Sequence, residues 1–157
     1  MGLLKPLSRK FIRLFSLPVK SYPLLAEAWL TLAWVDLAIR FAPHVRWRHW
    51  LESTANSSGA NQKELDINFI ITSSERVARH HVCAMNCLRR TMAQKMMLAR
   101  RGVSAQVHIG VKKETAGFAA HSWLTYQGRV LNDSDDVTER YVELERALWR
   151  SVKLFTE

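Results

Sequence analysis

The sequence predicts an α+β fold, with helices first, then a small antiparallel sheet, and a C-terminal helix. Three observations predict it. Apolar residues recur at helical spacing up to residue 101, alternate with polar or small residues from residue 103, and are separated by glycine-containing turns. The chain has 157 residues, enough for one domain whose core needs no disulfide or metal.

The first helix is predicted over Leu24–Phe41, with Pro23 in its first turn and Pro43 ending it. Its apolar face consists of Leu24, Ala28, Thr31, Val35, Ala38 and Ile39. The helix contains charged residues and is too short in apolar length to span a bilayer. We interpret it as a core-packing helix, with contact to a membrane surface as the lesser alternative.

A stretch rich in Ser, Asn, Gly and Ala over residues 53–62 predicts a linker, followed by a helical segment near Ser73–His81. We therefore expect an N-terminal helical segment over residues 1–52 and a catalytic core over residues 65–157. The two parts are expected to form one compact domain.

A central helix is predicted over Cys87–Arg101, capped by Asn86 and closed by Gly102. Leu88, Met92, Met96 and Ala99 share its predicted apolar face, and the basic side chains Arg89, Lys95 and Arg100 fall mostly outside that face. The methionines are interpreted as core filler.

Strands are predicted over residues 103–111, 118–125 and 129–133, the last two forming a hairpin bent at Tyr126-Gln127-Gly128. The tail over residues 137–155 is predicted to be helical, because Tyr141, Leu144 and Leu148 have suitable spacing.

The charge balance is basic, with 23 Lys and Arg against 14 Asp and Glu and a net charge of +9. Residues 89–113 contain no acid, whereas acids outnumber bases from Glu114 onward, so the distribution favours a docking partner over a uniform phosphate-binding face. No nucleic-acid motif is found, and nucleic acid is not expected as a partner. The two cysteines and the lack of a cleavable signal predict a reducing, cytoplasmic location.

Cys87 is the candidate nucleophile, because the amides at a helix start lower the pKa of a thiol and can bind an oxyanion. A buried structural role is the alternative unless a base is close. His121, in the first strand of the hairpin, is the candidate base.

Asp133 is the candidate carboxylate that orients His121. A three-residue loop ending in a left-handed Gly128 would place His121 opposite Asp133. A two-residue loop would turn Asp133 away and leave Asp135 or Asn132 as the orienting group.

Five blocks in order resemble the transglutaminase-like cysteine peptidases of lasso-peptide biosynthesis, in particular the stand-alone leader peptidases. They are CLRRTMA from Cys87, RRGV from Arg100, HIGVKK from His108, GFAAHSW from Gly117 and VLND from Val130. They cover about a third of the chain. This sequence has Thr91 where that family usually has Ser, and Ser122-Trp123-Leu124-Thr125 where Ala-Trp-Val-Glu is common.

The resemblance implies a transglutaminase-like or papain-like fold with Cys87, His121 and Asp133 as catalytic triad and no metal or cofactor. It implies proteolytic removal of the leader from a ribosomally made lasso-peptide precursor through an acyl-enzyme. The partners it implies are this precursor peptide, a separate leader-binding protein (a RiPP recognition element) and the lasso cyclase of the same pathway. The basic surplus around residues 89–113 is predicted to help hold the partner or the leader.

Three alternatives remain open. The ligand types in His80-His81-x-Cys83-x-x-x-Cys87 suit zinc, but a second ligand pair is missing. The same triad can also transfer an acyl group to an amine. A non-catalytic scaffold that presents the precursor is the third alternative.

Overall fold

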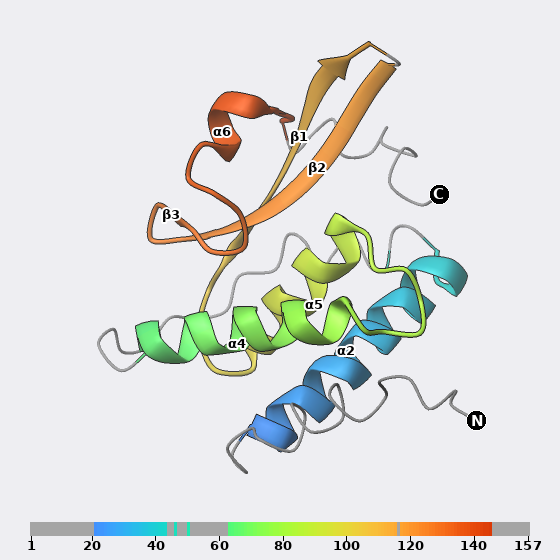
Figure 1. Ribbon diagram of the computed structural model, residues 1–157, viewed down its shortest axis with the longest axis vertical. Coiled ribbons are helices and arrows are strands. Elements are labelled where there is room, and N and C mark those ends of the chain that lie inside the picture. Colours follow the sequence, from blue (N-terminus) through green and yellow to red (C-terminus); the bar gives the residue numbers. More distant parts are fainter. Residues whose placement is uncertain (1–20, 44–45, 47–49, 51–62, 116, 146–157) are drawn as a thin grey trace, which may run out of the picture.

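The computed structural model describes residues 21–43, 46, 50, 63–115 and 117–145 (Figure 1). The helices are α2 (Ser21–Phe41), α4 (Lys63–Ala78), α5 (Cys87–Ala99) and α6 (Val137–Arg140). The strands are β1 (Gln106–Glu114), β2 (Gly117–Tyr126), β3 (Arg129–Val130) and β4 (Val142–Glu143). This order of helices followed by a small sheet confirms the predicted α+β class.

The sheet is antiparallel, with strand order β3-β2-β1-β4. β1 and β2 form its long central hairpin, in which Gly110 pairs with His121 and His108 with Trp123. Val107, Ile109 and Leu124 belong to the hydrophobic core. The alternation of side chains along each strand therefore places His108 and Trp123 on the other face of the sheet.

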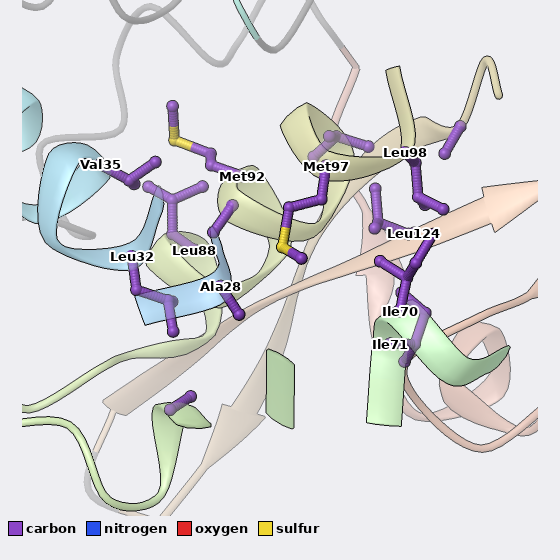
Figure 2. Packing of buried hydrophobic residues seen from close by; sticks show 14 of the residues in the cluster. Ala28, Leu32, Val35, Ile70, Ile71, Leu88, Met92, Met97, Leu98 and Leu124 are labelled. Atoms are coloured by element: carbon purple, nitrogen blue, oxygen red, sulfur yellow. The ribbon is translucent and has the colours of Figure 1, made fainter. Parts of the chain in front are cut away.

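Helix α5 is the centre of the molecule, because it contacts α2, α4 and β2 (Figure 1). Figure 2 shows Leu88 lying toward Val35 of α2, and Leu98 lying toward Leu124 of β2, all within one core cluster. The interpretation of the methionines is confirmed, since Met92 and Met97 are buried in this cluster.

The prediction for the polar side of α5 is wrong. Arg89 and Lys95 are buried, whereas Ala99, expected on the apolar face, is exposed. A helix with neighbours on several sides has no fully solvated face, so its polar side chains are buried together with their partners.

Helix α4 begins ten residues before the predicted segment near Ser73–His81 and ends at Ala78. Its buried face carries Ile67, Ile70 and Ile71, at helical spacing. The poor helix formers Thr72, Ser73 and Ser74 lie inside the helix because packing of the isoleucine face outweighs intrinsic propensity. The predicted linker over residues 53–62 lies outside the described residues.

The predicted C-terminal helix is also different. Within its described part, residues 137–145, only Val137–Arg140 is helical; Tyr141 is extended and leads into β4. Leu144 N donates to Ile109 O at 2.8 Å, so the segment after α6 pairs with the edge of β1, whose unpaired amides and carbonyls favour a further strand over a continued helix. Residues 146–155 of the predicted helix lie outside the described residues.

Helix α2 follows its prediction closely and ends two residues before Pro43. It packs against both α4 and α5, and Leu24, Ala28 and Leu32 join the same core as the rest of the chain. No helix in the described ranges has the length and apolarity of a transmembrane span.

Candidate active site

Cys87 is the first residue of α5, as predicted from the sequence. The side chain of Asn86 caps this helix by accepting a hydrogen bond from Arg89 N at 3.0 Å. The thiol is half-buried and is not in a disulfide. The positive end of the helix dipole therefore meets a sulfur that solvent can still reach.

The structure brings His121 and Asp133 together. His121 Nε2 lies 2.5 Å from Asp133 Oδ2. A side-chain hydrogen bond also joins His121 to Cys87. Because Nε2 is engaged with Asp133, Nδ1 is the ring nitrogen left for the sulfur. Cys87, His121 and Asp133 thus form a continuous chain of contacts.

The electrostatic environment of these three residues favours transfer of the thiol proton from Cys87 to His121. Burial opposes charge on Cys87, but hydrogen bonds from His121 and Ser122 outweigh it, and the pKa of Cys87 is lowered. The pKa of His121 is raised. The hydrogen bond with Cys87 contributes most to this increase, burial opposes it, and the hydrogen bond with Asp133 adds to it. Burial likewise opposes charge on Asp133, but hydrogen bonds from His121, Ser134 N and Arg140 keep its pKa low.

Two aromatic rings pack against the imidazole of His121. The ring centroid of Tyr141 lies 5.0 Å and that of the fully buried Trp123 6.2 Å from that of His121. Trp123 therefore packs beside His121. Gly110 permits this packing, because a Cβ atom there would lie 2.9 Å from the Trp123 ring and from Tyr141 Cβ. Tyr141 was missed as a site residue because its position was predicted to be helical.

The hairpin that brings Asp133 to His121 differs from the favoured prediction. Tyr126 pairs with Arg129, so the loop has two residues, Gln127 and Gly128, both with positive φ. The three-residue loop is therefore wrong, and so is the expectation that a two-residue loop turns Asp133 away. β3 ends at Val130, and the chain leaves the ladder before the register can set the direction of Asp133.

Asn132 lies where the ladder ends. Its side-chain oxygen accepts a hydrogen bond from Leu124 N at 2.8 Å, in place of a backbone partner. Its amide donates to Gln94 Oε1 at 2.8 Å and to Thr91 Oγ1 at 3.2 Å, both on α5. Asn132 therefore ties the segment before Asp133 to the helix of Cys87 and does not orient His121, while Asp135 is exposed.

Thr91 and Ser122, which differ from the motifs of the peptidases that the sequence resembles, lie in contact with each other. Thr91 Oγ1 donates to Ser122 O at 3.1 Å, and the two hydroxyl oxygens are 3.3 Å apart. Both residues are buried, and Ser122 also hydrogen-bonds Cys87. This contact of Ser122 with the candidate nucleophile was missed, because a serine in a strand carries no sequence signal for such a role.

A buried ion pair holds the first turn of α5 against α2. Arg89 Nε lies 2.7 Å from Asp36 Oδ1, and the side chains are only 8% and 5% exposed. Arg40, one turn further along α2, contacts the other carboxylate oxygen at 2.8 Å. This pair was missed because charged residues are rarely buried, and the sequence does not show that the two helices cross here.

All four arginines of the acid-free stretch 89–113 have carboxylate partners from other elements. Arg89 contacts Asp36, and Arg90 Nη1 lies 2.9 Å from Glu75 Oε2. Arg100 and Arg101 both contact Glu27, at 3.1 and 2.5 Å. The stretch therefore provides internal ion pairs, and the prediction that it holds a partner gains no support from its surface charge.

The other histidines named as candidates contact different groups. His81 Nδ1 accepts from Cys83 N at 3.2 Å, and His108 lies between Glu143 and Thr125. In the described ranges no three His, Cys, Asp or Glu side chains gather closely enough to hold a metal ion. The zinc alternative therefore has no geometric support among these residues.

Comparison with known proteins gives one match. A profile of the transglutaminase-like superfamily matches residues 27–146, which include all three residues of the candidate site. No curated protein matches the chain, and no solved structure does.

Proposed function

Since the chain belongs to the transglutaminase-like superfamily, which includes cysteine peptidases and acyl transferases, we propose that it is a cysteine peptidase that removes the leader from a lasso-peptide precursor. The observation that carries the proposal is the contact of Cys87, at the start of α5, with His121, and of His121 with Asp133. The five sequence blocks support the choice of substrate.

The proposed reaction begins with attack of Cys87 Sγ on the scissile carbonyl carbon. The first amides of α5 would donate hydrogen bonds to the oxyanion that forms. His121, having taken the proton of the thiol, would give it to the leaving amine, and the core peptide would depart with a free N-terminus. Asp133 would keep the imidazole oriented and stabilise its positive charge.

The second half of the reaction releases the leader. His121, now neutral, would take a proton from water, and the hydroxide would add to the thioester. Collapse of the intermediate expels Cys87 as thiolate and leaves a new carboxyl group on the leader. A separate leader-binding protein and the lasso cyclase are the proposed partners, the cyclase using the freed amine.

The test is reconstitution with the precursor encoded beside this chain and its leader-binding protein, followed by mass spectrometry. We expect two products whose masses sum to the precursor plus one water. Cys87→Ala should abolish cleavage completely, while the control Cys83→Ala should retain it. Cleavage by Cys87→Ala would leave only a scaffold role, and an amine-linked product without added water would indicate acyl transfer.

Reactivity of the thiol gives a second test that needs no substrate. Near neutral pH, iodoacetamide should label Cys87 much faster than Cys83, because only Cys87 lies at a helix start beside an imidazole. Equal labelling of the two thiols would contradict an activated nucleophile.

A further inference from the structure

A groove of about 530 Å³ lies beside the candidate active site. One wall consists of Glu75 and Arg76 in the second half of α4 and of Arg79 just after its end, and the other wall includes Asn132 and Asp133. Asp133 contacts His121, and His121 contacts Cys87, so a single residue lies between the lining of the groove and the candidate nucleophile. A peptide lying across Cys87 could therefore extend into the groove.

The two acids of the groove are already neutralised. Glu75 Oε2 lies 2.9 Å from Arg90 Nη1, and Glu75 Oε1 accepts from Gln94 Nε2 at 2.8 Å. Asp133 contacts His121 and, at 2.8 Å, Arg140 Nη2. Neither carboxylate adds an uncompensated negative charge to the groove.

The two arginines of the groove are not neutralised in this way. Arg76 and Arg79 are exposed, and neither has a carboxylate partner in the described part of the chain. Arg79 Nε donates to the backbone oxygen of Glu75, at 3.3 Å. They differ in this respect from Arg89, Arg90, Arg100 and Arg101, which all contact acids.

We propose that this groove binds an acidic side chain of the peptide substrate, with Arg76 and Arg79 donating charge-assisted hydrogen bonds to its carboxylate. The inference rests on the proposed peptidase function, because it takes the groove as part of the path of the substrate. It adds a specificity element that acts by charge at a distance from the scissile bond.

The experiment measures binding without turnover. A fluorescein-labelled peptide of alternating Ala and Glu is titrated with the full chain and followed by fluorescence anisotropy, beside its counterpart of alternating Ala and Gln. The variants are Arg76→Gln and Arg79→Gln. Lys113→Gln, at the exposed end of the β1–β2 hairpin, is the matched control because it removes the same charge away from the groove.

We expect each arginine variant to weaken binding of the Glu peptide about tenfold and to leave the Gln peptide nearly unaffected. Lys113→Gln should change the affinity by less than about twofold. Equal binding of both peptides by the unmodified chain, or an equal loss in Lys113→Gln, would overturn the proposal, because the overall charge of +9 would then explain the binding.

Iodoacetamide labelling of Cys87 in the same samples separates the groove from the proposed function. If Cys87 reacts rapidly and binding does not depend on Arg76 or Arg79, the groove proposal fails and the peptidase proposal stands. If binding depends on both arginines and Cys87 is inert, the groove holds a carboxylate but the peptidase proposal fails. Unchanged labelling in the arginine variants also shows that they fold.

Discussion

Two carboxylates reach the beginning of α5 from different elements. Asp36 of α2 contacts Arg89, and Asp133, after β3, contacts His121 and through it Cys87. Asp36 contacts the first turn of α5 directly, whereas Asp133 reaches it through His121 of β2. They differ in solvent access, since the side chain of Asp36 is 5% exposed and that of Asp133 is 19% exposed.

This difference in exposure suits the two carboxylates to different roles. A deeply buried ion pair costs free energy when either partner is removed, which suits it to fixing the position of a helix. A partly exposed group can meet a substrate and exchange protons with it. We therefore expect substitution of Asp36 to affect mainly stability and substitution of Asp133 to affect mainly activity.

Asp36→Asn should give the largest loss of stability. Arg89 would keep its charge without a counterion in a buried position, and the free energy of unfolding should fall by about 3–5 kcal/mol. Urea unfolding followed by circular dichroism measures this. Asp135→Asn, on an exposed residue, is the control; a similar loss in both variants would contradict a special role for the buried pair.

Asp133→Ala should leave the fold intact and lower the rate of cleavage by about 10²–10⁴-fold, because His121 loses the group that orients it. The dependence of activity on pH gives a second test of this role. Since the pKa of Cys87 is lowered and that of His121 raised, activity should fall as pH drops through the Cys87 value and again as pH rises through the His121 value. In Asp133→Ala the alkaline limb should move to lower pH; an unmoved limb would show that Asp133 does not act on His121.

Asn132→Ala should have a smaller, mixed effect. Gln94 and Leu124 N would lose buried hydrogen bonds, costing about 1–3 kcal/mol of stability, and Asp133 would be less well held. We expect slower labelling of Cys87 by iodoacetamide at neutral pH. Gln94→Met is the matched comparison, because it removes the neighbouring bond but keeps that between Asn132 and Leu124 N. Equal slowing in both variants would argue against a positioning role.

Glu27→Gln should have the smallest effect, although Glu27 contacts both Arg100 and Arg101. These side chains are partly exposed, so the loss of stability should stay within about 1 kcal/mol and vanish near 1 M salt. Unfolding at low and high salt tests this. A large, salt-independent loss would place this cluster in the same class as the Asp36–Arg89 pair.

The parts of the site that follow from local chemistry could be predicted. Asn86 before Cys87 and Gly102 after Arg101 are residues that begin and end helices by themselves, so α5 was placed to within two residues. The alternation around His121 placed it in a strand. These features depend on neighbours in the chain, which the sequence shows directly.

The parts of the site that depend on residues far away in the sequence could not be predicted. Asn132, Asp36 and the strand after α6 act through partners far along the chain, and the register of the hairpin was wrong although the pairing of His121 with Asp133 was expected. The sequence by itself determined the α+β class and the start of α5, and it supplied the three residues proposed for the site. Only the tertiary structure decided how Asp133 reaches His121, because a side chain that replaces a backbone partner can redirect a segment against its own register.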